Sequence, residues 1–379
     1  MSTFTTPFRR GNAKVVSEHG SAEVGQVSSS GDEESYSAMP GGRRGSRGKG
    51  EVTEGQKPAV EKNPVANSAA ECPEGYSIPD YQEIYAKLKD VIVEVRPSLQ
   101  NMYGKTEMEL NERLEVPIKR GEEMARKLIK DMGCSREVAK ELTVITLYDV
   151  AILIDDSDSM IDEEGGKRKE TLVKYIDNIT EIYSMAKKSG ILAMRFMNGP
   201  GGKKDWTGES SQEYLSQHIY GGVTRIGTEL KRKILDVFAT KNQNQVRPLL
   251  VLIVTDGMVE GEKKGLLKKV IRDCVNEREK AGKGFDAVSF QFSRIGNDYG
   301  AEELLTGLEN DSDLGKFVDV LPIEFDIENQ LDKWFVVPKI LLGAILPNWG
   351  GGSEHDIVKQ KNYLAEKEEE DVEDDDWAE

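Results

Sequence analysis

Apolar residues along the chain follow two patterns, with polar segments between them. Two uninterrupted apolar runs, 150–154 and 249–254, are bounded by polar residues, which is typical of buried strands in a parallel sheet. In 167–188 and 266–280, apolar residues recur three or four positions apart, as they do on amphipathic helices. This alternation predicts an α/β fold with a doubly wound, mostly parallel central sheet flanked by helices.

The same patterns place the remaining elements of this domain. Cys274 falls on the apolar face of the helix expected at 266–280, so we expect it to be buried rather than reactive. The other expected strands are 191–197, 287–295, 317–323 and a short antiparallel edge strand at Trp206. The other expected helices are 211–220, with a cap at Ser210–Ser211, 228–240, and 328–346, which Pro338 interrupts.

Two kinds of segment flank this domain. The first part of the chain is rich in Gly, Ser, Glu, Lys and Arg and poor in aromatic residues, so it cannot bury enough apolar surface to offset its conformational entropy. A helical pattern follows, with breaks at Pro97, Gly104 and Gly133, and predicts two to four short helices. We therefore predict a disordered N-terminal region (1–77), a helical extension (78–147), the α/β domain (148–346) and a disordered acidic tail (347–379).

Charge narrows the class of partner. The 379 residues carry a formal net charge of −17, which disfavours nucleic acid and anionic membranes. Ten acidic residues and one lysine lie in 366–379, so about half of this charge belongs to the tail. The longest apolar stretch, 334–346, is too short to span a bilayer, the start of the chain has no signal-peptide pattern, and the three cysteines cannot all pair. We expect an intracellular protein, in the cytoplasm or alternatively in the nucleus.

The candidate chemistry begins where the first apolar run ends. Asp155, Ser157 and Ser159 alternate directly after that strand, and ligands of open α/β sheets bind beyond the carboxyl ends of the strands. Alternate side chains point to one side, so one carboxylate and two hydroxyls can converge, as a hard cation such as Mg²⁺ requires. The simpler alternative is a Ser/Asp turn that caps the next helix.

Two later stretches favour the metal hypothesis. The second apolar run ends at Asp256-Gly257, and a glycine-rich loop starting at Gly221 delivers Thr224 just before a helical pattern. Together with the first stretch they resemble the von Willebrand factor A domain family, also called the I domain in integrins. The family's metal-ion-dependent adhesion site has the pattern D-x-S-x-S, a loop threonine and the aspartate of T-D-G. The matching residues are Asp155, Ser157, Ser159, Thr224 and Asp256.

The resemblance implies a mechanism. Mg²⁺ or Mn²⁺ would be bound directly by the first three residues, and by Thr224 and Asp256 directly or through water. An Asp or Glu of a protein partner would fill the sixth position. The chain would then be a non-enzymatic interaction module, an adaptor or scaffold; a metal-free scaffold with a vestigial site is the alternative. Independently, two adjacent carboxylates without a cation should raise the pKa of at least one of them.

Neighbouring acids depart from the family pattern or extend it. Asp158 stands where the family often has glycine or another small residue. Asp162 and Glu163 are spaced like the adjacent second metal site of the integrin β-subunit I-like domain. The simpler interpretation of both is acidic side chains on the surface.

A different class of protein shares part of this pattern. Haloacid-dehalogenase phosphatases, which depend on Mg²⁺, also end a strand with D-x-D, which Asp156-Ser157-Asp158 resembles, and use a later strand-end threonine, which Thr255 resembles. However, Met160 stands where that family has Thr or Val. We therefore expect no enzymatic activity.

Overall fold

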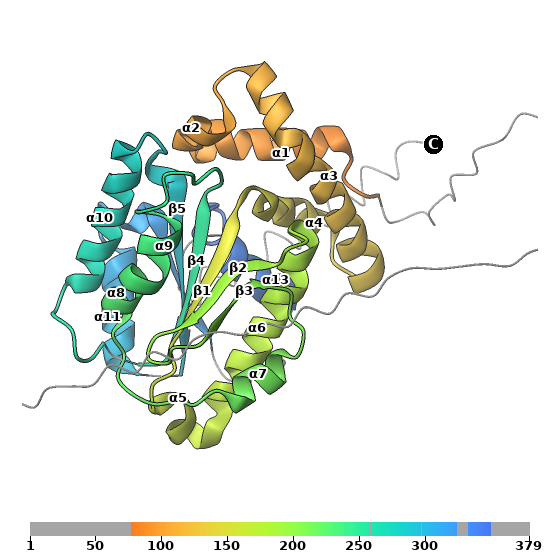
Figure 1. Cartoon of the computed structure of the whole chain (residues 1–379). Coiled ribbons are helices and arrows are strands. Elements are labelled where there is room, and N and C mark those ends of the chain that lie inside the picture. The colour runs from red at the N-terminus through yellow and green to blue at the C-terminus, as the bar shows by residue number, and fades with distance from the viewer. Residues whose placement is uncertain (1–76, 258, 297, 324–332, 350–379) are drawn as a thin grey trace, which may run out of the picture. The chain divides into compact units, whose positions relative to one another are not determined.

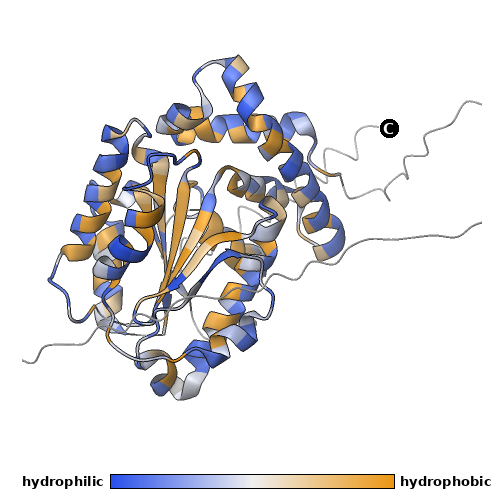
Figure 2. Cartoon of the chain, viewed as in Figure 1, coloured by the Kyte–Doolittle hydropathy of each residue, from blue (hydrophilic) through white to orange (hydrophobic). Residues whose placement is uncertain are grey.

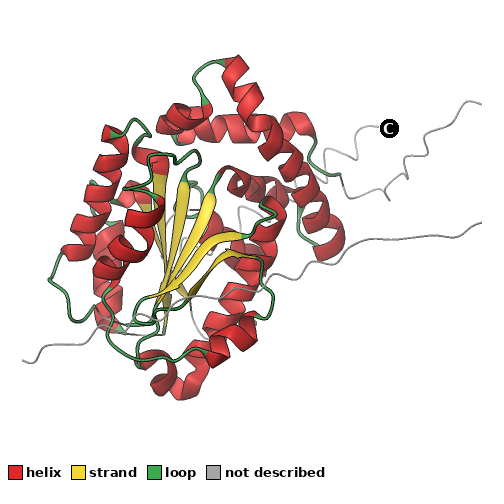
Figure 3. Ribbon diagram, in the orientation of Figure 1, coloured by secondary structure: helices red, strands yellow, loops and turns green. Residues whose placement is uncertain are grey.

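The computed structural model describes residues 77–257, 259–296, 298–323 and 333–349. Its centre is one six-stranded sheet in the order β3-β2-β1-β4-β5-β6, in which only β3 is antiparallel to its neighbour. This confirms the predicted doubly wound, mostly parallel α/β fold (Figure 3). The strands are β1 (Asp149–Ile154), β2 (Ile191–Phe196), β3 (Gly202–Trp206), β4 (Leu249–Thr255), β5 (Val288–Ile295) and β6 (Val318–Ile323).

Helices cover both faces of the sheet, which is why the central strands are apolar on both sides (Figure 2). Alternate residues of β1 divide between two cores: Ile152 packs with Ile176 of α6, while Leu153 packs with Ile271 of α10. The helices of the domain are α5 (Ser159–Asp162), η4 (Glu163–Gly166), α6 (Lys167–Ala186), α7 (Ser211–Gln217), α8 (Ile226–Glu229), η5 (Leu230–Leu235), α9 (Asp236–Phe238), α10 (Leu266–Lys280), η6 (Phe285–Ala287), α11 (Tyr299–Glu309), η7 (Gly315–Phe317) and α13 (Lys333–Leu342).

The N-terminal helices pack at the amino ends of the strands. Ser98 Oγ donates to Asp286 just before β5, at 2.6 Å, and Arg96 donates to the carbonyl of Lys316 just before β6, also at 2.6 Å. Figure 1 shows α1, α2 and α3 at one end of the sheet and α5 at the other, so the extension leaves the carboxyl ends open. Its elements are α1 (Tyr81–Asp90), η1 (Val91–Val95), η2 (Pro97–Leu99), α2 (Gln100–Tyr103), α3 (Glu107–Met132), α4 (Arg136–Leu142) and η3 (Thr143–Leu147).

The last helix differs from the prediction. Pro338 lies inside α13 and does not interrupt it: the packing of the helix in the core outweighs the hydrogen bond and the space that an interior proline costs. The helix ends at Leu342, and the first part of the predicted 328–346 range lies outside the described residues. The packed core continues to Trp349, which is fully buried with its ring centroid 6.2 Å from that of Phe335.

Two smaller predictions also need correction. Ser210 does not cap α7; it has φ 61° and makes no side-chain cap hydrogen bond, and the helix ends at Gln217. Helix α11 was not predicted, although Asp298 marks its start by accepting a hydrogen bond from the backbone of Ala301 at 2.7 Å. Cys274 is 1% exposed, as expected, and burial raises the pKa of its thiol to about 12.

Of the two segments predicted to be disordered, 1–77 and 347–379, residues 1–76 and 350–379 lie outside the described residues. Within the described residues, no helix is both long and apolar enough to span a bilayer.

Candidate metal centre

The structure brings all five predicted oxygen-bearing side chains together at the carboxyl ends of β1 and β4. Thr224 donates its hydroxyl hydrogen bond to Asp155 Oδ2 at 3.1 Å. The hydroxyls of Ser157 and Ser159 lie 3.1 Å apart, and Ser159 in turn donates to Asp256 Oδ1 at 3.1 Å. We call these five side chains the oxygen ring.

Strand register and a glycine loop create this convergence. Ile154 of β1 pairs with Val254 of β4, so the residues that follow the two strands emerge side by side. The loop that delivers Thr224 passes through Gly222, which has φ 105°. Any Cβ there would approach a neighbouring side chain to 2.6 Å, so both the conformation and the space require glycine.

Asp155 is fully buried and accepts hydrogen bonds from neutral donors. Its Oδ1 accepts from the backbone N–H of Ser157 at 3.0 Å, and its Oδ2 accepts from the hydroxyls of Thr224 and Thr255, the latter at 2.7 Å. Within the described part of the chain, no lysine or arginine lies at ion-pair distance from it. Burial raises its pKa even though these donors favour the charged form.

Asp256 has a charged partner that the sequence analysis did not identify. Arg168 Nη1 lies 2.7 Å from Asp256 Oδ2, and the arginine side chain is only 4% exposed. Burial and then the charge of Asp155 raise the pKa of Asp256 to about 6, although Arg168 and Ser159 lower it. The rise in pKa expected from carboxylate repulsion is therefore present at Asp256, whereas burial raises the pKa of Asp155.

The oxygen ring fits a hard cation. With bonds of about 2.1 Å, neighbouring ligands of an Mg²⁺ octahedron lie about 3.0 Å apart, close to the 3.1 Å separations observed. Gly257 lies against the ring: a Cβ there would be 3.6 Å from the hydroxyl of Thr224 and 3.8 Å from that of Ser159. Two carboxylates and three hydroxyls are the donors Mg²⁺ or Mn²⁺ would use. No group of three His, Cys, Asp or Glu residues in the described ranges is placed to hold a metal.

The carboxylate of Asp156, next to Asp155 in the sequence, makes its hydrogen bonds outside the oxygen ring. It is fully buried and accepts from the backbone N–H groups of Asn198 and Gly199, at 2.6 and 2.8 Å. His218 Nε2 lies 2.8 Å from Asp156 Oδ2, and its ring stacks on Phe196 with centroids 3.5 Å apart. The sequence analysis did not identify this pair, which joins the β1 loop to the residue that ends α7.

The other acidic candidates lie outside the ring. Asp158 is exposed. Asp162 is also exposed, on the short helix α5, and the side chain of Glu163 lies outside the described residues. For the proposed second metal site, the structure therefore shows only one exposed carboxylate.

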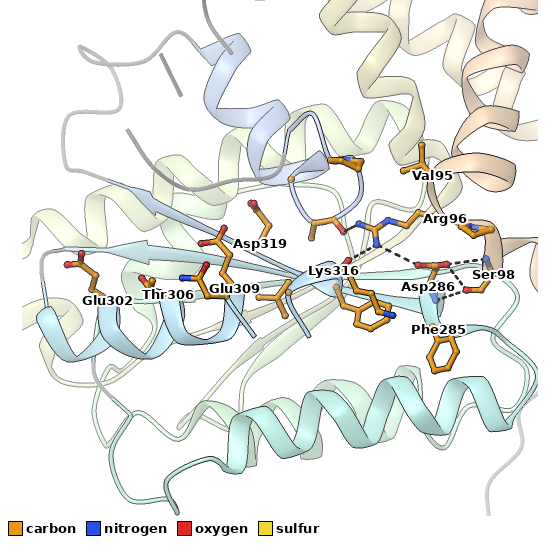
Figure 4. A pocket seen from close by; sticks show the side chains of 18 residues that line it. Val95, Arg96, Ser98, Phe285, Asp286, Glu302, Thr306, Glu309, Lys316 and Asp319 are labelled. Atoms are coloured by element: carbon orange, nitrogen blue, oxygen red, sulfur yellow. Dashed lines mark hydrogen bonds and ion pairs between the residues drawn. The ribbon is translucent and has the colours of Figure 1, made fainter. Parts of the chain in front are cut away.

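A cavity of about 1130 Å³ lies elsewhere, between the N-terminal helices, β6, α11 and the segment after α13 (Figure 4). At one end of it, the side chains of Arg96, Ser98 and Asp286 are engaged with one another and with the backbone. Arg96 donates to the carbonyls of Ala344 and Ile345, both at 2.8 Å, and Asp286 accepts from Ser98. This arrangement joins the N-terminal helices to the domain, and it offers no set of ligands comparable to the oxygen ring.

Comparisons with known proteins give structural similarity at low sequence identity. No protein-family profile matches the chain, and no curated protein matches it. Among solved structures, it is similar to a von Willebrand factor type A protein from Catenulispora acidiphila, with 15% sequence identity and a TM-score of 0.34. The match covers 52% of this chain and 43% of that one, so it spans less than half of the solved structure.

Proposed function

We propose that this chain is a non-enzymatic interaction module that binds an acidic side chain of a protein partner through a divalent cation, Mg²⁺ or Mn²⁺. The cation would be held by the five side chains of the oxygen ring. Bound there, it would supply a coordination position for an external carboxylate. The role that follows is that of an adaptor or scaffold.

One observation carries the proposal: two carboxylates and three hydroxyls from three separate loops meet within hydrogen-bonding distance. Burying two carboxylates costs free energy unless cations or donors compensate for it. The raised pKa values of Asp155 and Asp256 indicate incomplete compensation in the metal-free chain. A divalent cation would remove this conflict.

The surface near the ring suits a protein partner. Large apolar side chains are exposed at this end of the sheet: Ile219, after α7, is 87% exposed, and Tyr299, the first residue of α11, is 78% exposed. Val223, directly before Thr224, and Ile161 of α5 are each 38% exposed. Exposed apolar groups around a polar centre are typical of protein-binding surfaces.

A metal-free scaffold is the second candidate, and Arg168 favours it. The guanidinium already neutralises Asp256, and each carboxylate oxygen of the ring has a protein donor. In this alternative the ring would serve only to join the three loops. The two candidates differ in whether partner binding depends on metal.

A phosphatase of the haloacid-dehalogenase type has less support. Its two strand-end aspartates would have to share one cation. Here the carboxylate of Asp156 is held by Asn198, Gly199 and His218, while Asp158 is exposed. We therefore propose binding rather than catalysis.

The test is affinity capture in three conditions: wild type with Mg²⁺, wild type with EDTA, and Asp155→Ala with Mg²⁺. Captured proteins are identified by mass spectrometry and then tested as purified proteins, with their Asp and Glu residues replaced in turn. We expect binding only for wild type with Mg²⁺, and its loss when one partner carboxylate is removed. A purified partner that binds equally well in all three conditions would overturn metal dependence.

Two variants serve as controls for this test. Asp158→Asn removes an exposed charge next to the ring and should leave capture unchanged. Ile219→Ser should weaken partner binding without changing metal binding, because the side chain is exposed and the residue is not part of the ring.

A further inference from the structure

The guanidinium of Arg168 is held at the oxygen ring by residues from other segments of the chain. It lies at the start of α6, yet its guanidinium is buried against Asp256, which follows β4. Gly296, after β5, has φ 81°, and a Cβ there would lie 2.7 Å from Arg168 Nε. Three segments that are distant in the sequence therefore meet around this guanidinium at the ring.

The net charge at the ring depends on Arg168 and on which ligands are bound. Counting only the two ring carboxylates and Arg168, the charge is −1 without metal. It becomes +1 when a divalent cation binds and reaches zero only when an external carboxylate joins. Without the arginine, the same ring would be neutral with metal alone and −1 with the carboxylate.

We propose that Arg168 makes metal binding and carboxylate binding at the ring depend on each other. Its charge weakens the binding of the cation alone, and the carboxylate ligand restores neutrality and tightens the cation. Metal would then be retained mainly in the presence of an acidic partner. This inference rests on the proposed function and adds an electrostatic role for a residue outside the predicted ligand set.

The test is calorimetric titration of Mn²⁺ into the metal-free full chain, with sodium acetate or with sodium chloride at equal ionic strength. For wild type, we expect acetate to tighten Mn²⁺ binding severalfold. For Arg168→Met, we expect at least tenfold tighter Mn²⁺ binding in chloride and little further effect of acetate. Lys169→Met removes the same charge from the next residue and should behave like wild type. Arg168→Lys keeps the charge and should stay within a few-fold of wild type.

The outcomes separate this inference from the proposed function. If wild type binds Mn²⁺ and Arg168→Met binds it equally or more weakly, the inference is wrong and the metal site stands. If only Arg168→Met binds Mn²⁺, with or without acetate, the proposed dependence of metal binding on the carboxylate is wrong, and the metal-free scaffold describes the wild type. If neither binds, both proposals fail.

A measurement on wild type alone covers the case in which Arg168→Met does not fold. Adding Mg²⁺ should shift the Arg168 Nε–H resonance in NMR spectra, and adding acetate should shift it again. An unchanged resonance at saturating Mg²⁺ would contradict the proposal.

Discussion

Two buried carboxylate clusters lie on the same sheet and differ in how their charge is balanced. On β6, Asp319 is 2% exposed and lies 2.8 Å from the ammonium of Lys339, which is 1% exposed; Gln291 donates to the same carboxylate at 2.7 Å. At the oxygen ring, Arg168 pairs with Asp256, while Asp155 has no lysine or arginine at ion-pair distance among the described residues.

The comparison shows that burial of a carboxylate does not by itself mark a functional site. One carboxylate facing one ammonium is a complete pair, and it fixes α13 against the edge of the sheet. Two carboxylates with one cation leave an excess negative charge, which a ligand can neutralise. The predictions below test this difference.

The largest effect is expected from Lys339→Met, which would leave Asp319 buried without its ammonium. We expect the free energy of unfolding in urea to fall by about 3–5 kcal/mol, with or without Mg²⁺. Lys333→Met, on the same helix, removes a partly exposed pair with Glu181 and should cost less than about 1 kcal/mol. Equal losses for the two variants would show that Asp319 does not depend on Lys339.

Mg²⁺ should stabilise the chain through the ring alone. At 100 times the dissociation constant, ligand binding raises the free energy of unfolding by about 2.7 kcal/mol. We expect this increment in wild type and in Lys339→Met, and its loss in Ser157→Ala. The measurement is urea denaturation in Mg²⁺ and in EDTA. An increment that survives in Ser157→Ala would place the cation elsewhere.

Removing one charge from each cluster should change stability in opposite directions. In EDTA, Asp155→Asn removes an excess charge and should raise the free energy of unfolding by about 1–2 kcal/mol. Asp319→Asn removes the carboxylate that lies 2.8 Å from the ammonium of Lys339 and should lower the free energy of unfolding. Urea denaturation of both variants measures the two signs, and a loss in both would mean that the ring carries no excess charge.

The smallest effect concerns the glycine beside Arg168. Gly296→Ala places a Cβ in a left-handed conformation and 2.7 Å from Arg168 Nε, so we expect a loss of about 1 kcal/mol together with tighter Mn²⁺ binding. Gly343→Ala makes the matching change beside Asp319, with a Cβ 2.3 Å from its Oδ2, and should lower stability without affecting Mn²⁺. Mn²⁺ titration of both variants distinguishes the two clusters.

The sequence predicted the sheet because long apolar runs and amphipathic helices carry strong local signals. The acidic and hydroxyl residues directly after two apolar runs indicated one edge of the sheet, and the resemblance to a family motif added Thr224 to the set of five. Arg168 could not be found in this way. Between Lys167 and Lys169 it looks like one of three surface cations at a helix start, and only the folded chain brings it to Asp256.

The His218–Asp156 pair was missed for a related reason. The two residues are 62 positions apart, and only the fold brings the end of α7 next to the loop after β1. Pro338 led to the wrong prediction of a break in the last helix. The local preference of proline was outweighed by the packing of Phe335, Ile340 and Leu341, all at most 3% exposed.

The most direct test of the account is the number of Mn²⁺ ions bound per chain, measured by electron paramagnetic resonance on the metal-free protein titrated with Mn²⁺. Mn²⁺ is a suitable probe because oxygen sites for Mg²⁺ also accept it. The account predicts one bound ion in wild type and none in Asp155→Ala, with Asp158→Asn unchanged. No bound ion in wild type, or one that persists in Asp155→Ala, would contradict it.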